Sequence, residues 1–156
     1  MSGFIANAPS SVSPSVQISS DPFWPSVAIE QVRARLRLDQ SVTDARLVTA
    51  VSNAIATVNR ELHQWSQTHI AQGHPTLDHV PDQMINGQPV RSFLYLRAID
   101  GFVCAEINER YRSYDATRSG DQRADIEATT RDDYRRDARF AIRDFLGTPR
   151  ITVDLL

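Results

Sequence analysis

The sequence lacks lysine and long apolar runs, and it contains a single cysteine. All 17 basic residues are arginine and stand against 19 acidic residues, so the formal net charge is −2. This balance argues against a protein that coats DNA, because such proteins carry a clear positive excess. No apolar run approaches the roughly 20 residues that span a bilayer, so we expect a soluble protein with no membrane partner. The lone Cys104 cannot form an internal disulfide, and nothing before Arg33 resembles a secretion signal, so we expect a reducing cytoplasm.

Patterns that would support catalysis or metal binding are missing as well. Cys104 falls in an apolar helical pattern without a nearby histidine, which is typical of an inert core thiol. His63 and His69 are six positions apart, hence about 120° apart around a helix, and cannot share a metal there. His74 and His79 lie in a predicted loop without a supporting cysteine pair. We therefore expect no enzyme, no cofactor and no metal.

The length of 156 residues suits one domain with a single core. Residues 1–22 are rich in Ser, Pro, Ala and Val without helical period, which predicts a flexible N-terminal arm. Residues 23–149 carry four helical patterns, and residues 150–156 form a short extended C-terminal segment. The predicted fold class is mainly α: a bundle of about four helices with a long proline-rich loop.

The first two helical patterns begin near Ser26 and Thr43. Ser26 can cap a helix whose apolar stripe starts at Ile29. The second stripe continues without interruption to Gly73, which predicts one long amphipathic helix. The following loop, residues 73–90, has three prolines and an Asn-Gly pair, so we expect turns and a contact surface there, with no clear strand.

The third and fourth helical patterns flank the turn "TRSGDQ". The pattern over residues 90–112 is apolar nearly all round in its first half, with Phe93 in its stripe, which predicts a buried central helix. Asp100 lies within its stripe, and an ion pair with Arg97 is the simplest explanation. The fourth helix should end at Leu146, before Gly147 and Pro149. Its predicted inner face comprises Ile126, Thr130, Tyr134, Ala141 and Phe145.

Four arginines recur at every fourth position of the fourth helix, on the face opposite its apolar residues. We call Arg131, Arg135, Arg139 and Arg143 the arginine series. Each like-charged pair at this spacing costs on the order of 0.2–0.5 kcal/mol, so the series does not stabilise its own helix. A solvated face is the simplest interpretation, and contact with acidic groups of another subunit is the sharper hypothesis. A DNA-binding accessory protein that uses this series as a phosphate stripe is the alternative.

Two further groups are candidate contacts with a partner or another subunit. Phe23 and Trp24, between Pro22 and Pro25, either anchor the arm in an apolar pocket of a partner or pack onto the first helix of their own chain. The arginines of the first helix point in several directions, which suits ion pairs with adjacent subunits; the candidates are Arg33 and Arg37, with Arg35 between them.

The C-terminal segment "RITVDLL" alternates apolar and other residues. Ile151, Val153 and Leu155 would form one apolar edge of a strand. A single strand must add to an existing edge, so we predict β-augmentation onto a partner protein. The alternative is pairing with an unrecognised strand in the loop at residues 74–90.

Three segments carry a resemblance to a known family: "QVRARLRLDQSVTDARL" at residues 31–47, "ERYRSYDATRSGDQRAD" at 109–125 and "LGTPRITVDLL" at 146–156. Together they resemble the head completion proteins of temperate contractile-tailed bacteriophages, from about Phe23 onward. The resemblance implies a helical head-to-tail connector that binds as a ring below the portal after DNA packaging, retains the DNA and prepares the head for the tail. Implied partners are the portal protein, further copies and tail-side completion proteins, with packaged double-stranded DNA nearby but not bound sequence-specifically. The implied location is the virion neck, with assembly in the host cytoplasm, and neither activity nor cofactor is implied.

Overall fold

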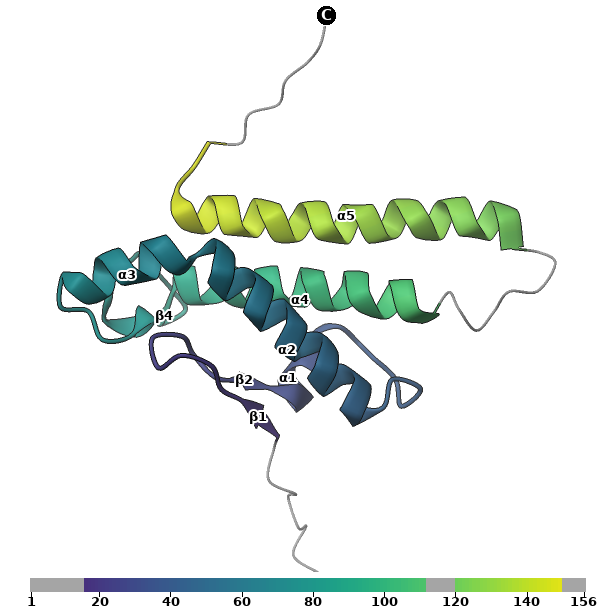
Figure 1. The fold of residues 1–156 in the computed structure, drawn as a ribbon, viewed down its shortest axis with the longest axis horizontal. Helices are drawn as coiled ribbons and strands as arrows, with labels where there is room; N and C mark the ends of the chain where they lie inside the picture. The colour runs from purple at the N-terminus through teal and green to yellow at the C-terminus, as the bar shows by residue number, and fades with distance from the viewer. Residues whose placement is uncertain (1–15, 112–119, 150–156) are drawn as a thin grey trace, which may run out of the picture.

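The computed structural model describes residues 16–111 and 120–149, with side chains placed in 16–110 and 131–149. The described part is mainly helical, as predicted (Figure 1). Its elements are β1 (Gln17–Ile18), β2 (Val27–Ala28), α1 (Ile29–Arg35), α2 (Asp44–Glu61), α3 (His63–Ala71), the 3-10 helix η1 (Leu77–His79), β3 (Met84–Ile85), β4 (Gln88–Pro89), α4 (Val90–Tyr111) and α5 (Gly120–Leu146). The strands form two antiparallel pairs, β1 with β2 and β3 with β4.

Helices α4 and α5 run side by side as the longest pair, and α2 crosses α4 on the other side (Figure 1). The close approach of α4 and α5 depends on Gly101. A Cβ atom placed there would lie 2.9 Å from the Cβ of Ala138 and 3.0 Å from the carbonyl oxygen of Tyr134. On α5, the buried face comprises Ala138, Ala141, Ile142 and Phe145. The predicted burial of Ala141 and Phe145 is thus confirmed, Tyr134 is half-buried, and the side chains of Ile126 and Thr130 lie outside the described residues.

Five aromatic side chains from four parts of the chain form the centre of the core. Trp24 stacks on Tyr95 with ring centroids 4.8 Å apart and an interplanar angle of 5°, and Phe23 meets Trp24 edge-on at 5.0 Å. Trp65 packs edge-on against Phe145 at 4.7 Å. Aromatic pairs at such distances add stabilisation beyond the burial of their area. The cluster therefore joins the N-terminal segment to α3, α4 and α5.

The folded unit begins before the expected arm boundary at residue 22. Gln17 and Ile18 pair with Ala28 and Val27, and the N–H of Ile29 donates to the carbonyl of Val16 at 3.0 Å. Residues 16–22 are therefore part of the fold, and residues 1–15 lie outside the described residues. The expected cap at Ser26 is wrong, because Ala28 occupies the N-cap of α1 and the Ser26 hydroxyl donates to Gln17 instead.

The single long helix expected from Thr43 to Gly73 is also wrong in the structure. It is divided at Leu62, whose backbone has φ −95° and ψ 2°, into α2 and α3. The apolar stripe continues through Leu62 because that side chain is fully buried, so periodicity alone could not show the break. The division accompanies the packing of Trp65 against Phe145. Gly73 adopts φ 91° after α3, consistent with the expected stop.

The loop after α3 contains regular structure that was not expected. Besides η1 it forms the hairpin β3–β4, so the prediction of no further strand is wrong. Asn86 and Gly87 form the two-residue turn with φ 55° and 75°. Two-residue hairpins favour turns in which both residues have positive φ, and Asn-Gly is their preferred sequence. The predicted turn at this dipeptide is therefore confirmed.

Candidate contact surfaces

The two arginines of α1, Arg33 and Arg35, contact groups of their own chain. Arg33 pairs with Asp44 at 2.6 Å and donates to two backbone carbonyls of the following loop. Arg35 makes a bidentate pair with Asp100, with Nε–Oδ2 at 2.6 Å and Nη2–Oδ1 at 2.9 Å. Asp100 therefore pairs with Arg35, and the predicted ion pair between Asp100 and Arg97 is wrong. Arg37 is exposed and follows the helix with φ 51°.

Phe23 and Trp24 are core residues. Their exposed fractions are 1% and 6%, and their ring contacts are with Tyr95, Trp65 and Phe145 of the same chain. Burial within the chain leaves neither side chain free to enter a pocket of another protein. The contact within their own chain is the interpretation that the structure supports, although the rings meet α3, α4 and α5 rather than capping α1.

The arginine series is partly neutralised within the chain. Arg135 pairs with Glu109 of α4 at 2.7 Å, and Arg131 lies 3.4 Å from Asp132. Arg143 donates to the carbonyl of Pro149 at 2.9 Å, whereas Arg139 is exposed. Ion pairs with carboxylates compete with phosphate binding, which weakens the interpretation of the series as a DNA stripe. Glu109 was not singled out in the sequence, because only the packing of α4 on α5 brings it to Arg135.

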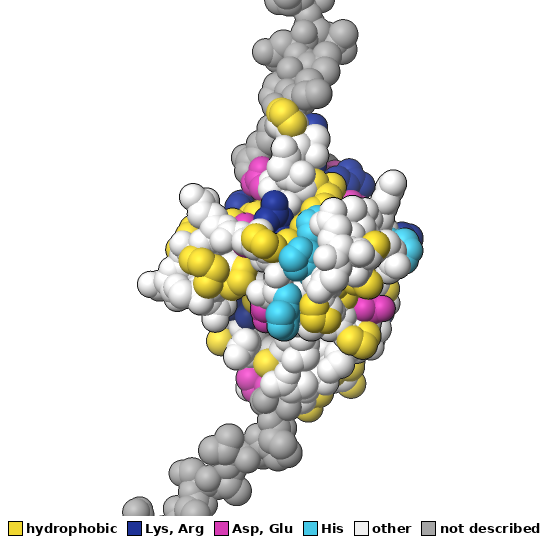
Figure 2. All heavy atoms as spheres, turned by 90° about the vertical axis from the view of Figure 1, so that its left-hand side faces the viewer, with side chains coloured by type: hydrophobic (Ala, Val, Ile, Leu, Met, Phe, Trp, Pro, Cys, Tyr) yellow, Lys and Arg dark blue, Asp and Glu magenta, His cyan; other side chains and the backbone are white. Residues whose placement is uncertain are grey.

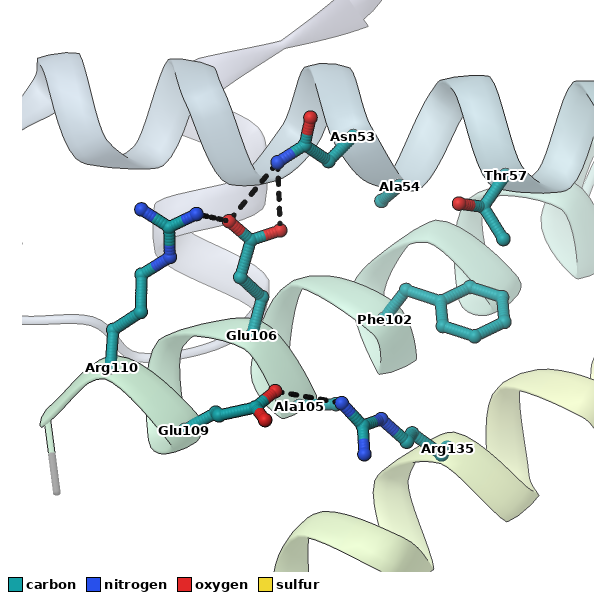
Figure 3. A pocket seen from close by; sticks show the side chains of 9 residues that line it. All are labelled: Asn53, Ala54, Thr57, Phe102, Ala105, Glu106, Glu109, Arg110 and Arg135. Carbon is teal, nitrogen blue, oxygen red and sulfur yellow. Dashed lines mark hydrogen bonds and ion pairs between the residues drawn. The ribbon is translucent and has the colours of Figure 1, made fainter.

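A pocket of about 350 Å³ opens between α2, α4 and α5 (Figure 3). Its apolar lining comes from Ala54, Phe102 and Ala105. Its polar rim is made of paired groups. Glu106 accepts from Asn53 at 3.1 Å and pairs with Arg110 at 2.9 Å, while Glu109 pairs with Arg135 across the pocket. The pocket therefore combines an apolar floor with a rim whose charges balance.

A second surface lies at the end of the molecule where α3 and α5 end and α4 begins. Arg91 joins these elements, because its Nε donates to the carbonyl of Phe145 at 3.3 Å and its guanidinium lies 5.5 Å from the Trp65 ring centroid. Figure 2 faces this end, where apolar side chains lie beside histidines. We call it the apolar end; its exposed large hydrophobic residues are Ile70, Met84, Ile85, Phe93 and Leu146. Phe93 is 61% exposed, so its predicted burial is wrong.

The other side chains that could react, Cys104, Tyr95 and His69, are held by burial and by contacts within the fold. Burial and the nearby Asp100 carboxylate raise the pKa of the Cys104 thiol to about 11, so it stays protonated at neutral pH. Burial likewise raises the pKa of the Tyr95 hydroxyl above its usual range, and this hydroxyl donates to Asn59 at 2.8 Å. His69 stacks on Trp65 with ring centroids 3.9 Å apart. Within residues 16–111 and 120–149 no group of three metal-binding side chains occurs, and no helix is long and apolar enough to span a membrane.

The expected C-terminal contact residues Ile151, Val153 and Leu155 lie outside the described residues. Their β-augmentation therefore stays a prediction. The structure does identify a strand pair within residues 74–90, which the alternative interpretation requires.

Comparison with known proteins finds a family and a relative that match most of the chain. A family model described as phage head completion protein (GPL) matches residues 18–156. The head completion/stabilization protein of Escherichia phage P2 is 38% identical over 131 residues, which are 84% of this chain and 78% of the P2 protein. No solved structure matches. The family match spans most of the chain, helices and loop included, and agrees with the resemblance noted in the sequence. The chain belongs to the phage head completion protein family.

Proposed function

We propose that the protein assembles as a ring below the portal after DNA packaging, retains the DNA and prepares the head for tail attachment. The observation that carries this proposal is the family match over residues 18–156. The P2 relative is a head completion/stabilization protein, which supports the proposal. The protein would act in the virion neck after assembly in the host cytoplasm. Its partners would be the portal protein, further copies and tail-side completion proteins.

This role requires binding surfaces rather than catalysis. The apolar end supports it, because exposed large hydrophobic side chains that gather at one place mark contacts with other proteins. The net charge of −2 and the pairing of Arg135 with Glu109 favour protein contacts over a DNA-coating function. Packaged DNA would lie nearby without sequence-specific contacts.

The proposal is tested with heads that have packaged DNA in the absence of this protein. Adding the purified protein should increase the nuclease-resistant DNA that the heads retain and should allow them to join purified tails. As a matched control, the protein is added to heads that lack the portal. After these heads are sedimented, we expect no protein bound to them. Heads that retain DNA and join tails equally well without the protein would contradict the proposal.

Steep loss of binding to free double-stranded DNA with rising salt would instead favour the DNA-binding alternative, because phosphate contacts release counterions. The measurement is an affinity series over ionic strength with DNA alone. We expect weak binding that does not depend on the arginine series.

A further inference from the structure

We propose that the hairpin β3–β4 of one copy inserts Ile85 into the pocket between α2, α4 and α5 of the next copy. This inference rests on the proposed ring and adds the contact that builds it. It joins two surfaces that were described separately above: an apolar projection at one end of the subunit, and a pocket with an apolar floor.

The hairpin is a projection with a fixed base. Met84 is 57% and Ile85 is 65% exposed, immediately before the Asn-Gly turn. At the base, Asp82 accepts from the backbone N–H groups of Gln83 at 2.8 Å and of Arg91 at 2.6 Å. Asp82 also pairs with the Arg91 guanidinium at 2.9 Å. These bonds hold the hairpin on the first turn of α4, so little ordering entropy remains to be lost on docking.

The pocket suits such a projection in size and polarity. Its volume of about 350 Å³ lies in the range of cavities that hold small ligands, roughly 300–1,000 Å³, so it has room for the side chains of a hairpin tip. Phe102, Ala54 and Ala105 provide the apolar floor. The rim charges are already paired with one another (Figure 3).

The chemistry of the hairpin matches this rim. Residues 83–89 carry no charge, so docking would not leave an unpaired ion beside Glu106 or Glu109. The amides of Asn86 and Gln88 can donate to carboxylates and accept from guanidinium groups, which permits hydrogen bonds to a rim of mixed sign. Burying the exposed Ile85 side chain on an apolar floor is favourable, whereas Met84, the preceding strand residue, points to the opposite face of the hairpin.

The pocket cannot receive the hairpin of its own chain. The hairpin leads directly into α4 at Val90, whereas Glu106 lies about 24 Å farther along the helix axis at a rise of about 1.5 Å per residue. A hairpin with a two-residue turn does not cover that distance. A β3–β4 hairpin that fills this pocket therefore belongs to a second copy.

The two surfaces are different, so the contact is head-to-tail. A head-to-tail contact repeats from one copy to the next and closes into a ring when the rotation between copies permits it. A symmetric contact between two identical surfaces would stop at a dimer. The hairpin and the pocket thus provide what a ring requires from each subunit.

Disulfide crosslinking tests the inference on assembled heads. In a Cys104→Ala background, one variant carries Ile85→Cys and another carries Thr57→Cys, which lines the pocket. The two are mixed, bound to portal-bearing heads and oxidised. We expect a covalent dimer on a non-reducing gel from the mixture. The matched control replaces Ile85→Cys by Val16→Cys, which is 49% exposed elsewhere on the chain, and should give no dimer.

Normal binding to heads without the Ile85–Thr57 dimer would overturn this inference and leave the proposed function standing. Failure of the unmodified chain to bind heads would overturn both. As a second variant, Ile85→Asp should lower occupancy of heads at least tenfold with an unchanged melting temperature. Val16→Asp, which places the same charge at a 49% exposed position outside the apolar end, should bind normally; an equal loss from both variants would show a nonspecific effect of the added charge and contradict insertion.

Discussion

Arg35 of α1 and Asp100 of α4, 65 positions apart in the sequence, join the two helices through two parallel hydrogen bonds. The Asp100 side chain is 14% exposed and that of Arg35 is 34% exposed, so the pair is partly shielded from solvent. Bidentate pairing between guanidinium and carboxylate groups gives geometric precision as well as attraction. The pair therefore fixes the position of the short helix α1, which has only seven residues.

Replacing Arg35 by Ala should lower the free energy of unfolding by about 1–2 kcal/mol, because Asp100 would remain partly buried without its partner. Arg97→Ala is the matched control, since it removes an exposed arginine from α4, the helix that carries Asp100, and it should change stability by less than about 0.5 kcal/mol. Chemical denaturation measures both. Equal effects would show that the pair does not stabilise the fold.

Gly101→Ala should destabilise the protein although alanine favours helices. The new Cβ would meet the Cβ of Ala138 at 2.9 Å and the backbone oxygen of Tyr134 at 3.0 Å, so α4 and α5 must separate. We expect overpacking to cost about 1–3 kcal/mol, which outweighs the helix-propensity gain of about 1 kcal/mol. Adding Ala138→Gly should recover part of the loss in thermal unfolding. No recovery would mean that the strain lies elsewhere.

Cys104 should be unreactive in the folded protein. Its pKa is raised to about 11, so the thiolate that reacts with alkylating agents is scarce at pH 8. The alkylation rate of the native protein should rise until the pH reaches about 11, whereas the unfolded chain should level off near the ordinary thiol pKa of about 8.5. Cys104→Ala should cost about 1 kcal/mol through lost packing and leave head completion intact. Loss of head completion in this variant, with its fold retained, would indicate a chemical role.

The sequence predicted the elements that rest on local signals. The start of α4 at Val90 follows from the apolar pattern, and α5 ends at Leu146 because Gly147 adopts φ 67°. The turn at Asn86 and Gly87 likewise could be predicted from these two neighbouring residues alone. These features need only neighbouring residues, which is why a single sequence suffices for them.

The errors concern contacts between distant segments. Leu62 interrupts the second helix while keeping its place in the apolar stripe, so its periodicity hides the break. Trp24 stacks on Tyr95 across 71 positions, and Arg135 finds Glu109 only because α4 packs on α5. Sequence spacing cannot identify such partners, since their proximity depends on the whole fold.

Within the arginine series, Arg135 and Arg139 should behave differently. Arg135→Glu would face Glu109 of its own chain and should lower the melting temperature. Arg139 is exposed, so Arg139→Glu should leave the melting temperature unchanged but impair head completion if this arginine meets acidic groups of another subunit. The double variant should show both defects. Normal completion by folded Arg139→Glu protein would remove the intersubunit hypothesis for this residue.

The C-terminal residues 151–156 provide the last test, because two receiving edges now compete. The alternation of Ile151, Val153 and Leu155 predicts a strand, and such a strand needs an edge to pair with. The portal would provide that edge in a partner, whereas β3–β4 offers one within the chain. Deleting Ile151 to Leu156 should leave the melting temperature unchanged and abolish attachment to portal-bearing heads if the partner provides the edge. A lower melting temperature with changed backbone amide signals at Met84 and Ile85 would indicate the hairpin instead, and normal attachment by a stable deletion variant would eliminate the portal contact.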